Sequence, residues 1–214
     1  MHRKKFLDIY QFIKNKRTMK KIIMTMAAAV VALTMNAQGM YVGGSMGFST
    51  TSYDGSTQRT SISFVPEFGV SFNDHIGVGM EIGYSTDKDE SNKDVKTVTS
   101  NSFRFAPYFR FTAFQLGKVG VFADGKFSYI SSTDKTEYTQ VGKTNVEQTV
   151  NSIGLYIQPG IAYSLNNKFS LVAKFGNIMG YTSSKPDVEG AKATTRFQFM
   201  NLSNNIQFGF YYNF

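Results

Sequence analysis

Apolar residues alternate with small or polar ones along most of this chain. From Ile62 to Phe72 the even positions carry Ile, Phe, Pro, Phe, Val and Phe, while the odd positions carry Ser, Val, Glu, Gly and Ser. A side-chain period of two predicts a β-strand with two unlike faces. The alternation recurs in seven further segments: 40–48, 76–84, 103–111, 119–129, 153–163, 169–175 and 206–214. The pattern therefore predicts eight strands.

The gaps between these segments alternate between short and long. Residues 73–75, 115–118 and 165–167 form short turns, whereas 49–61, 85–102, 130–150 and 182–196 are longer polar stretches. Short and long connections in strict alternation, with an even number of strands, are typical of outer-membrane β-barrels. Strands of nine to eleven residues also match the length of a tilted transmembrane strand, about 9–11 residues. We expect an all-β fold, an eight-stranded antiparallel up-and-down transmembrane β-barrel formed by residues 38–214.

The first 37 residues have the composition of a signal peptide. Met19-Lys20-Lys21 precedes an apolar run from Ile22 to Met35, and a small residue, Ala37, precedes the polar Gln38. A basic head, a short apolar stretch and a small residue before the cut are typical of a secretory leader. The run is too short for a helical membrane span, which needs about 20 residues. We predict cleavage after Ala37, with residues 1–18 being either an extended head or upstream of a true start at Met19.

The bulk of the apolar face indicates which side of the barrel it occupies. Phe, Ile, Leu and Tyr dominate that face on nearly every strand, and the lumen of eight strands has room for few such side chains. The opposite face is mostly Gly and Ser, which suits a crowded interior better than a solvated surface. The apolar face is therefore predicted to contact lipid, which disfavours a soluble ligand-binding barrel. Aromatic residues near both strand ends support two interfacial belts: Tyr84, Phe103, Tyr129 and Tyr181 toward the long gaps, and Phe72, Tyr163, Phe169 and Phe214 toward the short turns.

Composition and charge exclude several classes of function. The net charge of +8 comes mainly from the leader, since residues 1–37 hold eight of the 23 basic residues and one acid. The remainder has 15 basic and 14 acidic residues, so no nucleic-acid-binding surface is indicated. Without cysteine, and with only His2 and His75, the chain lacks a thiol nucleophile and the ligands of cysteine or multi-histidine metal sites.

The remaining candidates for chemistry are weak. His75 falls in a short turn, at the opposite end from the long polar gaps, so no Ser/His/Asp arrangement can be assembled at one site. The acidic run at residues 87–94 lacks the glycine of a calcium loop and contains two lysines, which favours a solvated loop tip. We expect no catalytic residue, no cofactor and no metal.

Charged residues on the inward face form the candidate site. Counting back from the short turns places Glu67 opposite Glu81, Arg110 near Asp124, and Gln158 opposite Lys174. Two opposed carboxylates repel each other unless cations reach them, and Arg110 and Arg104 are the nearest candidates. The predicted lumen charge network is Glu67, Glu81, Arg104, Arg110, Asp124, Lys126 and Lys174. It could form a selectivity ring for ions, but we favour a charge-paired plug because eight strands leave no open channel.

The leader, the eight strands, the short turns and the ending Phe208-Gly209-Phe210-Tyr211-Tyr212-Asn213-Phe214 resemble the small outer-membrane β-barrel family of the OmpA-membrane-domain and OmpX type, over residues 39–214. The resemblance implies an outer-membrane protein of a Gram-negative bacterium, surrounded by outer-membrane lipid. It also implies that Phe208, Phe210, Tyr212 and Phe214 form the C-terminal signal that the outer-membrane assembly machinery recognises.

Members of that family serve as adhesins, envelope stabilisers or structural proteins, so the fold does not select one role. We expect a structural or surface-interaction protein without enzymatic activity. The alternative is a narrow porin-like channel for ions or small solutes. The sequence does not specify a ligand for the four long loops.

Overall fold

The computed structural model describes residues 39–214, except 54–56, 91–94, 139–144, 189 and 203–205. The predicted signal peptide, residues 1–37, lies outside the described residues. Among the described residues there is no helix with the length and apolarity needed to cross a membrane. The described chain forms ten strands: β1 (Gly39–Tyr53), β2 (Thr57–Ser71), β3 (Ile76–Asp89), β4 (Val95–Leu116), β5 (Val119–Tyr138), β6 (Val146–Ser164), β7 (Phe169–Lys174), β8 (Asn177–Pro186), β9 (Thr194–Asn201) and β10 (Gln207–Asn213).

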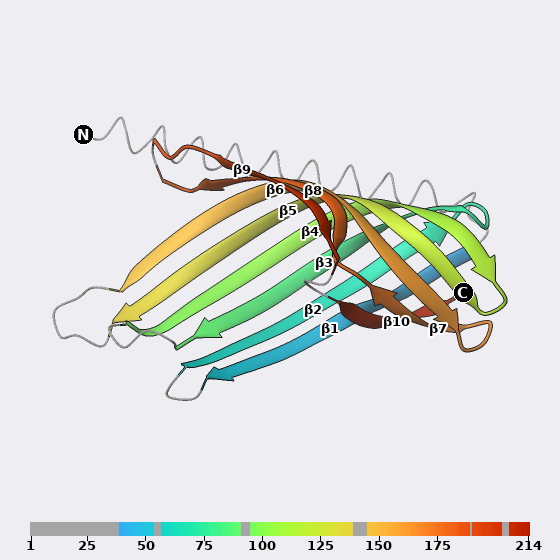
Figure 1. The fold of residues 1–214 in the computed structure, drawn as a ribbon, viewed down its shortest axis with the longest axis horizontal. Coiled ribbons are helices and arrows are strands. Elements are labelled where there is room, and N and C mark those ends of the chain that lie inside the picture. Colours follow the sequence, from blue (N-terminus) through green and yellow to red (C-terminus); the bar gives the residue numbers. More distant parts are fainter. Residues whose placement is uncertain (1–38, 54–56, 91–94, 139–144, 189, 203–205) are drawn as a thin grey trace. The chain divides into compact units, whose positions relative to one another are not determined.

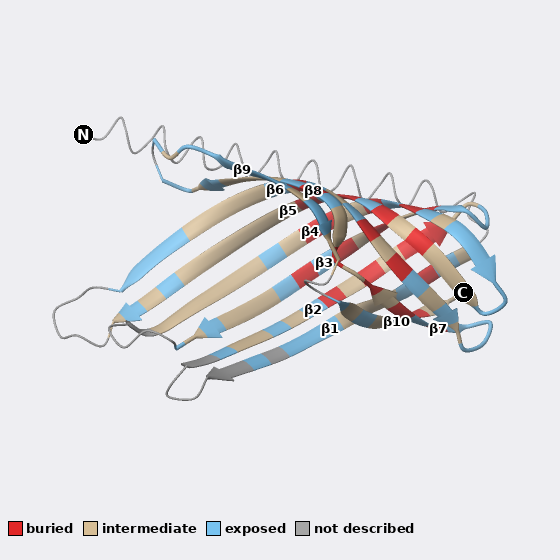
Figure 2. Ribbon diagram, in the orientation of Figure 1, coloured by how far each residue is buried: buried red, intermediate tan, exposed pale blue. Residues whose placement is uncertain are grey.

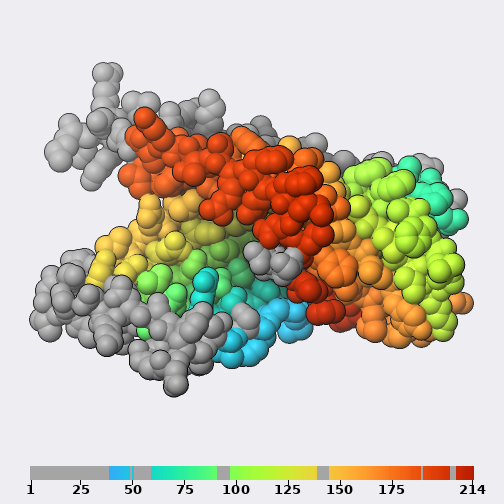
Figure 3. Space-filling view, in the orientation of Figure 1, coloured from blue at the N-terminus to red at the C-terminus, as the bar shows by residue number. Residues whose placement is uncertain are grey.

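These strands form one closed antiparallel barrel, as predicted (Figure 1). β1 to β6 pair in chain order, and β10 closes the sheet by pairing with both β1 and β7. Figure 3 shows atoms of the C-terminal strand, in red, against atoms of β1, in blue. The ten strands occupy eight positions around the barrel, because β7 and β8 together occupy the seventh position and β9 and β10 the eighth; β7 and β10 match the predicted strands 169–175 and 206–214, and β8 and β9 extend them toward the long hairpins.

The seventh strand is interrupted at Phe175 and Gly176. On one side β6 pairs Gly160 with Lys174, and on the other it pairs Ile157 with Met179, so β7 and β8 differ by two residues in register. The extra residues form a local bulge. The Gln158 side chain is held there, because its Nε2 donates to the carbonyl of Phe175 at 2.6 Å. The bulge therefore fixes a lumen-facing amide close to the predicted charge network.

The long polar gaps are mostly strand, which corrects their assignment as loops. β4 has 22 residues and β5 has 20, and their pairing continues out to Val95 and Tyr138. Alternation disappears there because both faces are polar, but the backbone ladder continues. Cross-strand hydrogen bonds reinforce it, including Ser102 to Ser132 at 2.7 Å and Thr133 to Thr149 at 3.1 Å. Part of the acidic run, residues 91–94, lies outside the described residues.

Two of the short turns share one geometry. In each, an asparagine Oδ1 accepts from backbone N–H groups two and three residues later: Asn73 from His75 and Ile76, and Asn166 from Lys168 and Phe169. Such Asx turns have a fixed length. The second turn extends past residue 167, its predicted end, and Lys174 pairs with Gly160. The prediction that Gln158 lies opposite Lys174 was wrong by two residues.

The distribution of burial is inverted relative to a soluble protein. Phe48, Phe64, Leu155 and Phe210 are among many large apolar side chains that are more than half exposed, whereas charged side chains are buried. Figure 2 shows the buried positions gathered in the half of the barrel nearest the short turns. An apolar exterior around a polar interior is the arrangement of a membrane barrel, and the prediction of a lipid-facing apolar surface is confirmed.

The apolar band ends at aromatic residues. Tyr84 on β3 pairs directly with Phe103 on β4 at the edge toward the long hairpins. Phe169 on β7 pairs with Tyr212 on β10 near the short turns, and their rings meet edge-on at 5.2 Å. Aromatic rings at both borders are expected where a barrel meets the membrane interfaces.

Candidate functional site: the lumen charge cluster

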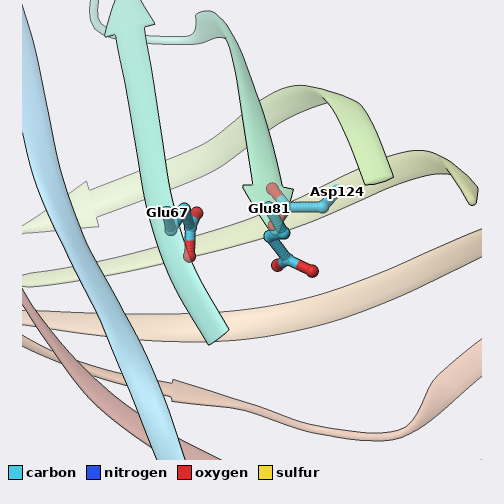
Figure 4. A group of neighbouring side chains, drawn as sticks. All are labelled: Glu67, Glu81 and Asp124. Carbon is cyan, nitrogen blue, oxygen red and sulfur yellow. The ribbon is translucent and has the colours of Figure 1, made fainter. Parts of the chain in front are cut away.

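Three carboxylates meet inside the barrel. Glu67 on β2, Glu81 on β3 and Asp124 on β5 point into the same part of the lumen (Figure 4). One oxygen of each lies within 4.8 Å of an oxygen of the other two, and the residues are 5%, 2% and 0% exposed. Glu67 and Glu81 are direct cross-strand partners, as the turn count predicted. Buried carboxylates this close require compensating cations.

Arg110 on β4 supplies the first cation. Its Nε lies 2.7 Å from Oδ1 of Asp124 and its NH2 nitrogen lies 2.9 Å from Oδ2, a two-bond guanidinium–carboxylate contact. The same NH2 nitrogen lies 3.1 Å from Oε1 of Glu67. Asp124 is the register partner of Arg110, so strand pairing alone places this ion pair. Paired contacts of this kind are strong and directional.

Two lysines complete the cluster from other strands. Lys174 on β7 donates to Oε2 of Glu67 at 2.6 Å and to Oε1 of Glu81 at 2.7 Å. Lys126 on β5 donates to the same oxygen of Glu81 and, at 2.5 Å, to Oε1 of Gln158. We define the lumen charge cluster as Glu67, Glu81, Asp124, Arg110, Lys126 and Lys174. It contains three anions and three cations, so it is electrically neutral.

Four aromatic rings surround the Arg110 guanidinium. Its Cζ lies 4.0 Å from the centroid of Phe122, 5.1 Å from Tyr108 and 5.3 Å from both Tyr41 and Tyr211. Cation–π contacts stabilise this largely buried guanidinium. We call Tyr41, Tyr108, Phe122 and Tyr211 the aromatic cage.

Two cage hydroxyls also bind Glu67. Tyr108 and Tyr211 donate to Oε1 of Glu67 at 2.5 and 2.8 Å. Because the Tyr108 proton goes to Glu67, the 2.6 Å contact between the Tyr41 and Tyr108 hydroxyls has Tyr41 as its donor. Glu67 thus accepts from two tyrosines, Arg110 and Lys174, and its buried charge is well compensated.

Glycines on neighbouring strands make room for the cage. A Cβ atom at Gly69 would collide with the Tyr41 ring, one at Gly79 with Tyr108, and one at Gly160 with Phe122. The small residues of the inward face are therefore the positions over which the aromatic rings lie.

The carboxylate spacing resembles that of a metal site, but the ligand atoms are occupied. Within the described chain, Glu67, Glu81 and Asp124 are grouped closely enough to hold an ion. Lys174 Nζ lies among them, 3.6 Å from Oδ2 of Asp124 as well as bonded to both glutamates. A metal would have to displace this ammonium group, so the arrangement fits a resident lysine rather than a cation site.

The structure brings together six of the seven charges predicted for the network. Arg104 is the exception: it makes no ion pair with any described residue. Its side chain lies along its own wall, against the backbone of its register partner Gly83. Lys126 and Lys174, which were expected farther round, reach Glu81 from other strands instead. Of the two arginines predicted to hold the glutamates, Arg110 contacts Glu67, whereas Arg104 contacts neither glutamate and acts on Glu81 through space.

The sequence analysis did not place the cage tyrosines in the site. Tyr41, Tyr108 and Tyr211 occupy inward positions by strand parity, so alternation could have identified them. A large aromatic residue on a face otherwise rich in glycine was the available signal.

The other predicted positions lie at the short-turn end. Phe208, Phe210, Tyr212 and Phe214 follow one another on the outer face of the C-terminal strand and its end, with Tyr212 and Phe214 rings 5.0 Å apart. The backbone N–H of Phe214 donates to the carbonyl of Met40 at 2.9 Å, which fixes the last residue against β1. His75 is exposed in its turn, where Nδ1 lies 3.0 Å from the Thr112 carbonyl oxygen.

Cavities lie on both sides of the cluster. Toward the short turns, a cavity of about 260 Å³ is lined by Arg110, Phe122, Tyr211 and turn residues. Toward the long hairpins, two cavities of about 430 and 250 Å³ are lined by residues that include Arg104, Glu81 and Lys126. The cavities on the two sides share no lining residue, because the cluster lies between them.

Comparisons with known proteins agree with this architecture. Residues 22–214 match the family model described as outer membrane protein beta-barrel domain. Among solved structures, the chain is similar to Neisserial surface protein A (15% identity, TM-score 0.47), with 82% of this chain and 97% of that one covered. It is also similar to Ail, the attachment invasion locus protein of Yersinia pestis (14%, TM-score 0.47, 84% and 100% covered), and to a major outer membrane protein from Thermus thermophilus (15%, TM-score 0.47, 82% and 99% covered). A search of curated protein sequences found no match.

Proposed function

The chain belongs to the outer membrane protein beta-barrel domain family, and from this premise we propose that it has a structural or surface-interaction role, with a lumen closed by its charge cluster and no catalytic site. It is an outer-membrane protein, and its exposed apolar band is in contact with lipid. The observation that carries the proposal is the neutral, fully engaged cluster between the two sets of cavities.

Closure of the lumen follows from how the cluster is held. An ion crossing it would have to break contacts among charges that are at most 8% exposed. Separating such a buried pair is costly because each partner is left without compensation. The cage narrows the remaining space with four aromatic rings. A selectivity ring would need charges free to exchange with a passing ion, whereas here each carboxylate is bound by at least two cations.

A surface role is supported by the length of the hairpins. β5 has 20 residues, and a strand rises about 3.3 Å per residue. Tilted by about 40° from the membrane normal, it spans about 50 Å across the membrane direction, roughly twice the height of an apolar band of about 25 Å. Beyond Tyr129 the strand continues with polar residues on both faces. The β3–β4 and β5–β6 hairpins therefore extend past the apolar band on the side opposite the short turns. Within this proposal the leader exports the chain, and the C-terminal aromatic strand is recognised by the assembly machinery.

Topology can be tested by labelling, because the chain contains no cysteine. Lys192→Cys lies between β8 and β9 and Asn167→Cys lies in the β6–β7 turn, and both positions are exposed. A membrane-impermeant maleimide added to intact cells should label Lys192→Cys alone, and both positions after the membrane is permeabilised. Labelling of Asn167→Cys alone in intact cells would mean that the hairpins face the periplasm.

The surface role can be separated from the structural role by shortening one hairpin. Removing residues 133–136 together with their partners 146–149 takes four paired positions out of the β5–β6 hairpin and keeps the register of the rest of that hairpin. A strain lacking the protein would be complemented with the full or the shortened chain. If the hairpin serves surface interaction, the shortened chain should insert normally but fail to restore adhesion. Full restoration would leave only the structural role.

Closure can be tested in planar bilayers with the purified barrel. We expect no steady conductance steps from the wild-type protein. Regular steps whose ion selectivity changes on Arg110→Leu, with thermal stability unaffected, would replace the plug with a narrow channel for ions or small solutes.

A further inference from the structure

The two cavities on the long-hairpin side of the cluster form a continuous chamber. They share Arg104, Ile130 and Gln207 in their linings and measure about 430 and 250 Å³. We call this space the outer chamber. The smaller lobe lies against Glu81 and Lys126 of the cluster, and the larger lobe extends toward Asp87. The chamber plays no part in closing the lumen, so its polar lining needs a separate explanation.

Arg104 provides the chamber with a positive charge that acts on Glu81 only through space. The guanidinium is half-buried and makes no hydrogen bond or ion pair with any residue that the structure describes. The cluster beneath it is neutral, and Glu81 is engaged by Lys126 and Lys174. Asp87 lies four residues beyond the Gly83 register partner of Arg104, about 13 Å along the strand, too far to neutralise it by contact. Within the described part of the chain, the Arg104 guanidinium is therefore left without a contact ion pair, and Asp87 lines the larger lobe of the same chamber.

The wall beside Arg104 contributes hydrogen-bond donors that are also unused. Ser128 is 2% exposed, and its Oγ is buried without a hydrogen-bond partner among the described residues. A buried hydroxyl left unpaired is costly. The side chains of Asn177, Gln198 and Gln207 line the same space, and none of them bonds to another described side chain. Within the described chain, amides and a hydroxyl that lack such partners thus surround the Arg104 guanidinium.

We propose that the outer chamber binds a small organic carboxylate, with Arg104 as its anchor. A planar guanidinium matches the two oxygens of a carboxylate and can hold them by two parallel hydrogen bonds. Ser128 and the chamber amides would donate to the remaining lone pairs. The lobes of about 250 and 430 Å³ admit a molecule of a few carbon atoms. Arg104 and Lys126 outnumber Glu81 in the lining of the smaller lobe, so this lobe favours anions, whereas Asp87 lines only the larger lobe.

The test is a titration of the barrel, purified from outer membranes, with sodium succinate, followed by NMR chemical shifts and calorimetry. The wild-type protein should bind succinate saturably, and neither neutral succinamide nor sodium chloride at the same ionic strength should reproduce the effect. Arg104→Gln should weaken binding about 10- to 100-fold, as expected for loss of a charged two-bond contact. Arg104→Lys keeps the positive charge but loses the planar guanidinium that makes two parallel hydrogen bonds. Its affinity for succinate should therefore lie between those of the wild type and Arg104→Gln.

Matched variants control for general effects. Arg196→Gln removes an exposed arginine on β9 and should leave succinate affinity unchanged. Ser128→Ala deletes the unpaired hydroxyl. The barrel should stay folded, as judged by heat-modifiable migration on gels, while the affinity for succinate falls about fivefold. Absence of saturation, equal effects of sodium chloride, or an Arg104→Gln variant that binds as well as the wild type would each show that the chamber holds water only.

Discussion

Glu67 and Glu81 face each other across the β2–β3 hairpin and share one lysine, whose Nζ lies 2.6 Å from Oε2 of Glu67 and 2.7 Å from Oε1 of Glu81. Lys174 reaches them from β7, on the other side of the lumen. Arg110 on β4 and Lys126 on β5 each contact one of these carboxylates, but the cation that bridges both comes from a distant strand. The barrel has to close before this bridge can form, which links the buried charges to the completed fold.

Lys174→Met should destabilise the barrel by about 3–5 kcal/mol, because two opposed buried carboxylates lose the cation between them. Urea unfolding of the refolded barrel in lipid vesicles measures this loss. Adding Glu81→Gln restores neutrality and should recover part of it. Lys168→Met, at an exposed lysine in the β6–β7 turn, is the matched control. Equal stability of the Lys174 and Lys168 variants would show that the bridge contributes nothing.

Arg110→Leu should also cost about 3–5 kcal/mol, since it leaves Asp124 buried without its main partner. The Arg110→Leu, Asp124→Leu double variant should recover part of that loss, because the two charges leave together. Glu67 retains Lys174 and two tyrosines, so Arg110 should couple to Asp124 more strongly than to Glu67. Double-mutant cycles in the same unfolding assay measure the coupling energy of Arg110 with Asp124 and with Glu67. A larger coupling energy with Glu67 would contradict the observed geometry.

Gly160→Val should destabilise the barrel by about 1–3 kcal/mol, because a side chain there collides with the Phe122 ring beneath Arg110. Gly120→Val is the matched control. It lies on the inward face of the adjoining strand, where an added Cβ meets nothing within 4 Å. Thermal melting followed by the loss of heat-modifiable migration should separate the two variants. Similar melting temperatures would mean that the cage can move aside freely.

Phe214→Ser should leave export intact but reduce insertion into the outer membrane, if the terminal aromatic residue acts as the assembly signal. Leu116→Ser controls for the loss of apolar surface, because Leu116 is 77% exposed at the short-turn end of β4 and Phe214 is 71% exposed. Fractionation followed by gels of unboiled samples measures the inserted barrel. Equal losses in both variants would point to membrane contact rather than to recognition.

Much of the fold could be predicted because strand alternation is a local property. Period two identified the eight strand positions, and the bulk of the apolar face assigned it to lipid. The Asn73 turn fixed the pairing of Glu67 with Glu81 by simple counting. Counting across the Asn166 turn gave a pairing of Gln158 with Lys174 that was wrong by two residues. The polar ends of β4 and β5 were missed because their two faces are alike, which removes the signal although the backbone still pairs.

The sequence by itself thus determined which side chains enter the lumen and which of them meet across a hairpin. Only the tertiary structure decided which charges meet across the lumen, because that depends on the closure and stagger of all the strands and not on neighbours in the chain. Closure brings Lys174 to the two glutamates and wraps Arg110 in rings from β1, β4, β5 and β10. It leaves Arg104 two residues above Ala106, the register partner of Glu81, and without an ion pair to any residue that the structure describes, since the lysines from β5 and β7 have already filled the space around that carboxylate.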